Sequence, residues 1–146
     1  MPAEEFIHVG MSCKDPILVE RFYTRHFGFK RARVAAIPGG QIVFIKSGNV
    51  YLEIFRAEGE APLPPADKDG PHYPGWRHIA FKVDDIDAKL KQMGDDAKIT
   101  LGPLSFDNFV QGWRTVWIAD PEGNIIEVTQ GYQDEANPPP LASSNT

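Results

Sequence analysis

Apolar and polar residues alternate in several short stretches, the pattern of strands with one covered face. Between the first two stretches, Leu18, Phe22, Tyr23 and Phe27 repeat at helical spacing, and Asp15-Pro16 is typical of a helix start. In the first half we expect strands at 6–12, 30–37, 41–47 and 50–56 and a helix at 16–27. In the second half we expect strands at 77–83, 96–101, 113–119 and 125–130 and a helix at 86–93. Each half therefore has the order β-α-β-β-β.

The two halves also repeat one another in sequence. Placing FIHVGMSCKDP over WRHIAFKVDDI puts His8 on His78 and aligns the aspartates that follow them. Glu53 follows one Gly-Asn turn and Glu127 follows another, with the second glutamate one residue nearer its turn. A repeat of this kind predicts two copies of one structural module.

The chain divides at segments rich in Pro, Gly and charge. We expect a first βαβββ module at 1–57, a linker at 58–76, a second module at 77–132 and a disordered tail at 133–146. The predicted fold class is α+β, with the two modules paired.

Composition excludes several classes of function. The 146 residues carry a net charge of −5 without a basic stripe, which argues against nucleic-acid binding. No apolar run is long enough to predict a membrane helix, and no secretory signal is visible. One cysteine, Cys13, fits a reducing cytoplasm and is expected to be buried and inert. His26 and His72 have no partner in the repeat and are expected on the surface or in the linker.

Strand alternation places four polar residues on the faces away from the main aliphatic set. They are His8, Glu53, His78 and Glu127. Taken singly, each is explained by a half-exposed strand. The recurrence of a histidine and a glutamate at matching points of both halves instead favours a divalent-metal site, where two carboxylates balance the charge of the ion.

The motifs resemble those of a known superfamily. HVGM and FYTRHFGF, then RHIAFKVDDID, then WIADPEGNIIEV are similar to motifs of the vicinal oxygen chelate superfamily, over roughly residues 5–131. That group includes glyoxalase I, methylmalonyl-CoA epimerase, extradiol dioxygenases and bleomycin and fosfomycin resistance proteins. The resemblance implies paired modules that form an open, cupped barrel around one Ni, Zn, Co, Mn or Fe ion. Its ligand positions fall on His8, Glu53, His78 and Glu127.

A fourth ligand, Glu53, makes the resemblance closest to glyoxalase I, because the extradiol and fosfomycin enzymes use three ligands and the bleomycin-binding members none. The implied reaction removes a proton next to a carbonyl, with Glu127 as the base and Glu53 as a ligand and second candidate base. The alternatives are an epimerase of an acyl thioester, an extradiol-type dioxygenase using Fe(II), and a ligand-sequestering protein without turnover.

The predicted partner is a small-molecule substrate of open identity. Arg25 matches a glyoxalase arginine that holds a glutathione carboxylate, and it equally suits the end of a helix. Tyr51, Phe109 and Trp113 are candidates for the pocket wall, although such aromatic residues more often pack in a core. Other glutathione-binding positions do not match. We also expect a homodimer, with the site either within one chain or between two.

Overall fold

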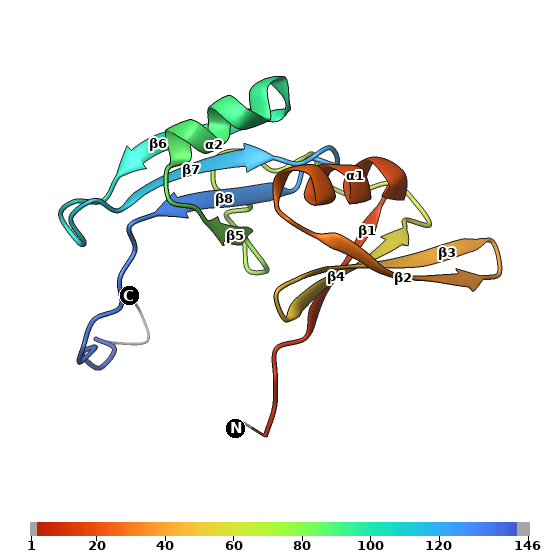
Figure 1. The fold of residues 1–146 in the computed structure, drawn as a ribbon, viewed down its shortest axis with the longest axis horizontal. Coiled ribbons are helices and arrows are strands. Elements are labelled where there is room, and N and C mark those ends of the chain that lie inside the picture. Colours follow the sequence, from red (N-terminus) through yellow and green to blue (C-terminus); the bar gives the residue numbers. More distant parts are fainter. Residues whose placement is uncertain (1–2, 143–146) are drawn as a thin grey trace.

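The computed structural model describes residues 3–142, and its elements repeat one order (Figure 1). The first module contains β1 (His8–Cys13), α1 (Pro16–His26), β2 (Lys30–Ile37), β3 (Gly40–Ser47) and β4 (Val50–Arg56). The second contains β5 (Ile79–Lys82), α2 (Ile86–Met93), the 3-10 helix η1 (Gly94–Asp96), β6 (Lys98–Ser105), β7 (Arg114–Ala119) and β8 (Ile125–Gln130). The predicted βαβββ repeat is confirmed.

Each module builds its own four-stranded mixed sheet. The strand orders are β1-β4-β3-β2 and β5-β8-β7-β6, so the first and last strands of each module are neighbours. Those neighbours run parallel, while the other pairs are antiparallel. The same register recurs, with Gly10 beside Glu53 and Ala80 beside Glu127. The α+β, two-module prediction is confirmed, and the described strands form two separate sheets.

The helices begin where the sequence indicates. The Asp15 carboxylate accepts hydrogen bonds from the backbone N–H groups of Ile17 and Leu18, and Pro16 occupies the first turn of α1. Asp85 caps α2 in the same way by accepting from the Ala88 N–H. Gly94 follows α2 as its C-cap, and its φ of 60° is positive, a backbone conformation that glycine adopts without steric cost.

One hydrophobic core spans both modules. It includes Ile54 of β4 and Ile126 of β8, both fully buried, together with aromatic side chains from α1 and the segment after it. The ring of Phe27 stacks on Phe81 of β5 with 4.3 Å between centroids. The end of the first module's helix is therefore packed against the second module's sheet. This core takes the aliphatic strand faces and leaves the opposite faces for polar side chains.

A buried polar contact also joins the modules. The Tyr23 hydroxyl donates to the Asp120 carboxylate at 2.7 Å, and only 5% of Asp120 is exposed. Burial, together with the Asp120 charge, raises the pKa of Tyr23 well above its usual value. Nearby, the Glu122 carboxylate accepts from the backbone N–H groups of Lys14 and Asp15, just before α1. The loop after β7 thus holds the start of the first module's helix.

The expected surface position of His26 is wrong. This residue lies in the last turn of α1 and is buried against the second module, with Nε2 at 2.7 Å from an Asp96 carboxylate oxygen. That hydrogen bond holds the pKa of Asp96 below its usual range. The helix pattern of one module alone does not reveal which of its polar residues meets the other module.

Several predicted boundaries shift. The strand expected at 77–83 begins at Ile79, after His78, and the strand expected at 96–101 becomes Lys98–Ser105 because η1 precedes it. Residues 58–76 contain neither helix nor strand, and the same holds for 133–142. Part of the tail predicted to be disordered, 143–146, lies outside the described residues. No helix in the described chain has the length and apolar character needed to cross a membrane.

Cys13 is expected to be unreactive in the folded protein. Only 2% of it is exposed, and burial, with the charges of Glu122, Asp120 and Asp15, raises its thiol pKa to about 11. At pH 8 we expect a thiol reagent to modify the native protein at least about a hundredfold more slowly than the urea-unfolded chain. The rate of absorbance change with a disulfide reagent measures this. Equal rates in the two states would contradict the assignment.

Candidate metal centre

The first half-site lies on the sheet of the first module. His8 begins β1 and Glu53 lies in the neighbouring β4, with His8 Nε2 and Glu53 Oε1 3.2 Å apart. The ring of Phe44 meets the His8 imidazole edge to face, at 6.3 Å between centroids. His8, Phe44 and Tyr51 help to line a shallow pocket of about 340 Å³. The alternation of side chains along the predicted strands placed His8 and Glu53 on the same face of the sheet.

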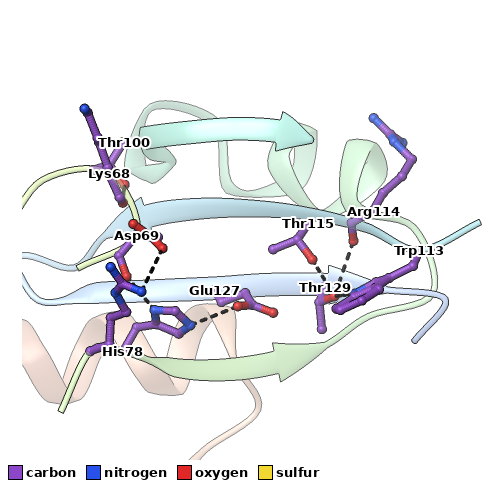
Figure 2. A network of polar contacts seen from close by, with 10 residues as sticks. Lys68, Asp69, His78, Thr100, Trp113, Arg114, Thr115, Glu127 and Thr129 are labelled. Carbon is purple, nitrogen blue, oxygen red and sulfur yellow. Dashed lines mark hydrogen bonds and ion pairs between the residues drawn. The ribbon is translucent and has the colours of Figure 1, made fainter. Parts of the chain in front are cut away.

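The second half-site has the same pair on the second sheet. His78 Nε2 lies 2.9 Å from Glu127 Oε1 (Figure 2). His78 Nδ1 lies 2.5 Å from the backbone carbonyl oxygen of Asp69, in the linker. A carbonyl oxygen only accepts, so Nδ1 carries the hydrogen of this bond. The other ring nitrogen, Nε2, faces the Glu127 carboxylate.

A carboxylate oxygen accepts and does not donate, so the contact with Nε2 needs a positive centre between the two atoms, either a proton or a metal ion. Histidines that bind metals commonly donate their second ring N–H to a backbone carbonyl, as His78 does to Asp69. Imidazole nitrogen and carboxylate oxygen are ligands that Zn²⁺ and neighbouring transition metals accept. The donor set of each pair therefore fits half of the ligand shell of a divalent metal ion.

Within one chain the two pairs stay apart. The residues at 3–142 contain no group of three or more His, Cys, Asp or Glu side chains placed to hold a metal ion. The four ligands predicted from the repeat thus form two half-sites of two donors each. A complete four-ligand site requires that each His–Glu pair meet a second His–Glu pair.

Glu127 also borders a larger pocket, of about 540 Å³. Figure 2 shows Glu127 between His78 on one side and Thr129 and Trp113 on the other. The Trp113 indole N–H donates to the Thr129 hydroxyl at 3.0 Å, which fixes the indole at the pocket wall. The candidate base thus has a histidine at one side and open space at the other.

The structure separates the predicted substrate-binding residues. Tyr51 lines the pocket beside His8, and Trp113 lines the pocket beside Glu127. Phe109 is 72% exposed and packs near Trp113 without lining either pocket. The Arg25 guanidinium lies 3.9 Å from the Asp96 carboxylate at the contact between modules, away from both linings. The role of Arg25 in binding a substrate carboxylate stays a prediction.

Sequence reasoning missed several residues around the second half-site. Asp69, which fixes the His78 ring, acts through its backbone, so its side-chain type carries no signal. Trp117 lies opposite Glu127 in β7, and its buried indole N–H has no hydrogen-bond partner among the described residues. Lys82 could have been found from the sequence, because side chains alternate along a strand and Lys82 therefore lies on the same face as His78. Tyr132 also lines this pocket, although it lies beyond the last strand.

The chain belongs to the glyoxalase/bleomycin resistance protein/dioxygenase superfamily, whose sequence profile matches residues 5–128. A relative in Escherichia coli K12, the uncharacterized protein YaeR, is 30% identical over 82 residues. That match covers 56% of this chain and 59% of the relative, so the chain spans about three fifths of it.

Solved structures share the fold over nearly the whole chain. A glyoxalase family protein from Enterococcus faecalis is 29% identical, with a TM-score of 0.64 over 87% of this chain and 98% of that one. A lactoylglutathione lyase from Agrobacterium tumefaciens is 25% identical, with a TM-score of 0.58 over 90% of this chain and 96% of that one. These likenesses agree with the two-module α+β architecture and with superfamily membership.

Proposed function

We propose that this chain is a divalent-metal-dependent enzyme of glyoxalase I type, a lyase or isomerase. Its reaction removes the proton next to a carbonyl of a small substrate with two adjacent oxygens. The observation that carries the proposal is the pair of matching half-sites, each with a histidine Nε2 within 3.2 Å of a glutamate oxygen. The likeness to the Agrobacterium lactoylglutathione lyase supports the same reaction type.

His8, Glu53, His78 and Glu127 would hold the metal ion. A divalent ion bound there supplies Lewis-acid stabilisation of the negative charge that develops on a substrate oxygen. Glu127 is the better placed base, because it lines the larger pocket and its carboxylate reaches the open space there. Its oxygen takes the proton from the carbon next to the carbonyl, while the bonding electrons move toward the carbonyl oxygen. Glu127 then returns the proton to the former carbonyl carbon, while the hydroxyl proton moves from the oxygen of the deprotonated carbon to the former carbonyl oxygen.

We further propose that the complete site forms between two copies of the chain. In one chain the helices and the shared core occupy one face of each sheet, and both His–Glu pairs lie on the other. A two-fold homodimer that sets the first module of one copy against the second module of its partner brings the four ligands together twice.

Mixing two inactive variants tests this arrangement. A dimer of one His8→Ala chain and one His78→Ala chain has one site with all four ligands and one site lacking two. We expect the purified mixed dimer, isolated with two different tags free of histidine, to regain about half of the parent's metal content and turnover. Each homodimeric variant is expected to retain neither, because every site then lacks a histidine.

The readouts are metal content by mass spectrometry and proton exchange by NMR with hemithioacetals and 2-substituted acyl thioesters. If the mixed dimer has as little metal and turnover as the two homodimeric variants, the site does not form across the dimer. If the parent protein holds no metal and takes up none of Ni, Zn, Co, Mn or Fe, the metalloenzyme proposal fails. The ligand-sequestering alternative then remains for the two pockets beside the half-sites.

A further inference from the structure

The pocket beside Glu127 carries a charge pattern that the proposed reaction does not use. Its lining residues are Lys82, Trp113, Glu127, Thr129, Tyr132 and Asp134. We propose that Lys82 is a specificity residue that binds a carboxylate at the far end of the substrate. The identity of the reacting end rests on the proposed function, whereas binding of a carboxylate in this pocket is testable without turnover.

Strand geometry places Lys82 along the substrate's path. Its Cα pairs with Thr129 in β8, just as Ala80 pairs with Glu127 one step earlier. Residues two apart in a strand share a face, so Lys82 is on the same side as Ala80 and Glu127. Two residues of strand span about 7 Å. A substrate whose reacting carbon lies at Glu127 therefore reaches Lys82 with a short spacer.

The pocket offers a ligand one cationic group, the Lys82 ammonium. Among the residues that the structure describes, Lys82 forms no ion pair with a carboxylate. Asp134 is engaged by the Tyr132 side chain, and this hydrogen bond raises the pKa of the tyrosine. Because the Glu127 and Asp134 carboxylates also line the pocket, they repel a singly charged carboxylate less than a doubly charged phosphate.

Two aromatic rings in the pocket lining offer apolar surface to a ligand. Trp113 and Tyr132 pack edge to face, with 5.3 Å between ring centroids. The Trp113 N–H is used by the Thr129 hydroxyl, which also bonds the Thr115 hydroxyl at 2.7 Å. These polar groups satisfy one another and leave ring surface for the ligand. The substrate class is thus a short acyl compound with a terminal carboxylate and an apolar spacer.

Phenylacetate and phenylacetamide are suitable probes, because they share a shape and differ in charge. Binding to the parent protein is followed by the NMR shift of the Trp113 indole N–H, which a Trp113→Phe variant assigns. Trp76, which is 95% exposed, and Trp117 give reference signals in the same spectrum. We expect phenylacetate to bind about fivefold more tightly than phenylacetamide, the effect of one partly exposed ion pair.

Substitutions at Lys82 complete the test. Lys82→Met is expected to bind the two probes equally, Lys82→Arg to keep the preference for phenylacetate, and Lys91→Met, an exposed control on α2, to match the parent. The inference is overturned if phenylacetate leaves the Trp113 signal unmoved, if the parent binds both probes alike, or if Lys82→Met keeps the preference.

The two proposals fail in different ways. If proton exchange is absent but the carboxylate preference depends on Lys82, the proposed reaction is wrong and the carboxylate subsite stands. If proton exchange occurs but the preference is absent, the subsite is wrong and the reaction stands.

Discussion

Replacing Glu127 by glutamine is expected to lower the rate of substrate proton exchange by at least about a hundredfold, because an amide does not accept the proton. The side chain keeps its size, and the half-buried position in β8 tolerates the amide. The measurement is the loss of the hydrogen next to the carbonyl in deuterated water, followed by NMR for hemithioacetals and 2-substituted acyl thioesters. It is made at saturating metal, because Glu127 is also a proposed ligand. Thermal unfolding checks that the variant is folded.

Two further glutamate variants make this result specific. Glu58→Gln, on the exposed linker, is the matched control and is expected to exchange protons as the parent does. Glu53→Gln, in the other half-site, is expected to lose metal affinity by about tenfold or more, as ligand changes do. If Glu127→Gln keeps more than about a tenth of the parent rate, Glu127 is not the base. A larger rate loss in metal-saturated Glu53→Gln would transfer that role to Glu53.

The elements and both His–Glu pairs were predictable because they depend on local rules. Alternation along a strand fixed the face of His8, and the same rule applied to Glu53 once β1 and β4 were paired. Because the two halves repeat, the same arrangement was predicted for His78 and Glu127. Helix starts followed from Asp15 and the other aspartate cap, which act on the next few residues only.

What the sequence did not reveal depends on contacts between distant segments. His26 is buried because the end of α1 meets Asp96 of the other module, 70 residues away. The ring of His78 is oriented by a backbone carbonyl of the linker. Every residue type has such a carbonyl oxygen, so the sequence does not mark this contact. The stacking of Phe27 on Phe81 likewise joins two segments that are far apart in the sequence, and the apolar pattern does not say which aromatic residues pair.

Replacing Asp120 by alanine is expected to destabilise the protein by about 3–5 kcal/mol, among the largest effects of one substitution. The carboxylate accepts from the Tyr23 hydroxyl and from the Asn124 side chain, and its other bonds are to the N–H groups of Glu122 and Asn124. Alanine leaves these donors unpaired, with Tyr23 fully buried. Urea unfolding measures the free energy, and Tm is expected to fall by about 10 °C.

A graded series locates the loss in this one network. Tyr23→Phe removes only the hydroxyl and is expected to cost about 1–2 kcal/mol, and Asp84→Ala, an exposed control, less than about 0.5 kcal/mol. The double variant Tyr23→Phe/Asp120→Ala is expected to cost less than the two single losses added together, because both remove the same hydrogen bond. Additive losses would mean that Tyr23 and Asp120 act independently. Since the bond joins α1 to the loop after β7, the coupling energy measures what this one polar contact contributes between the two modules.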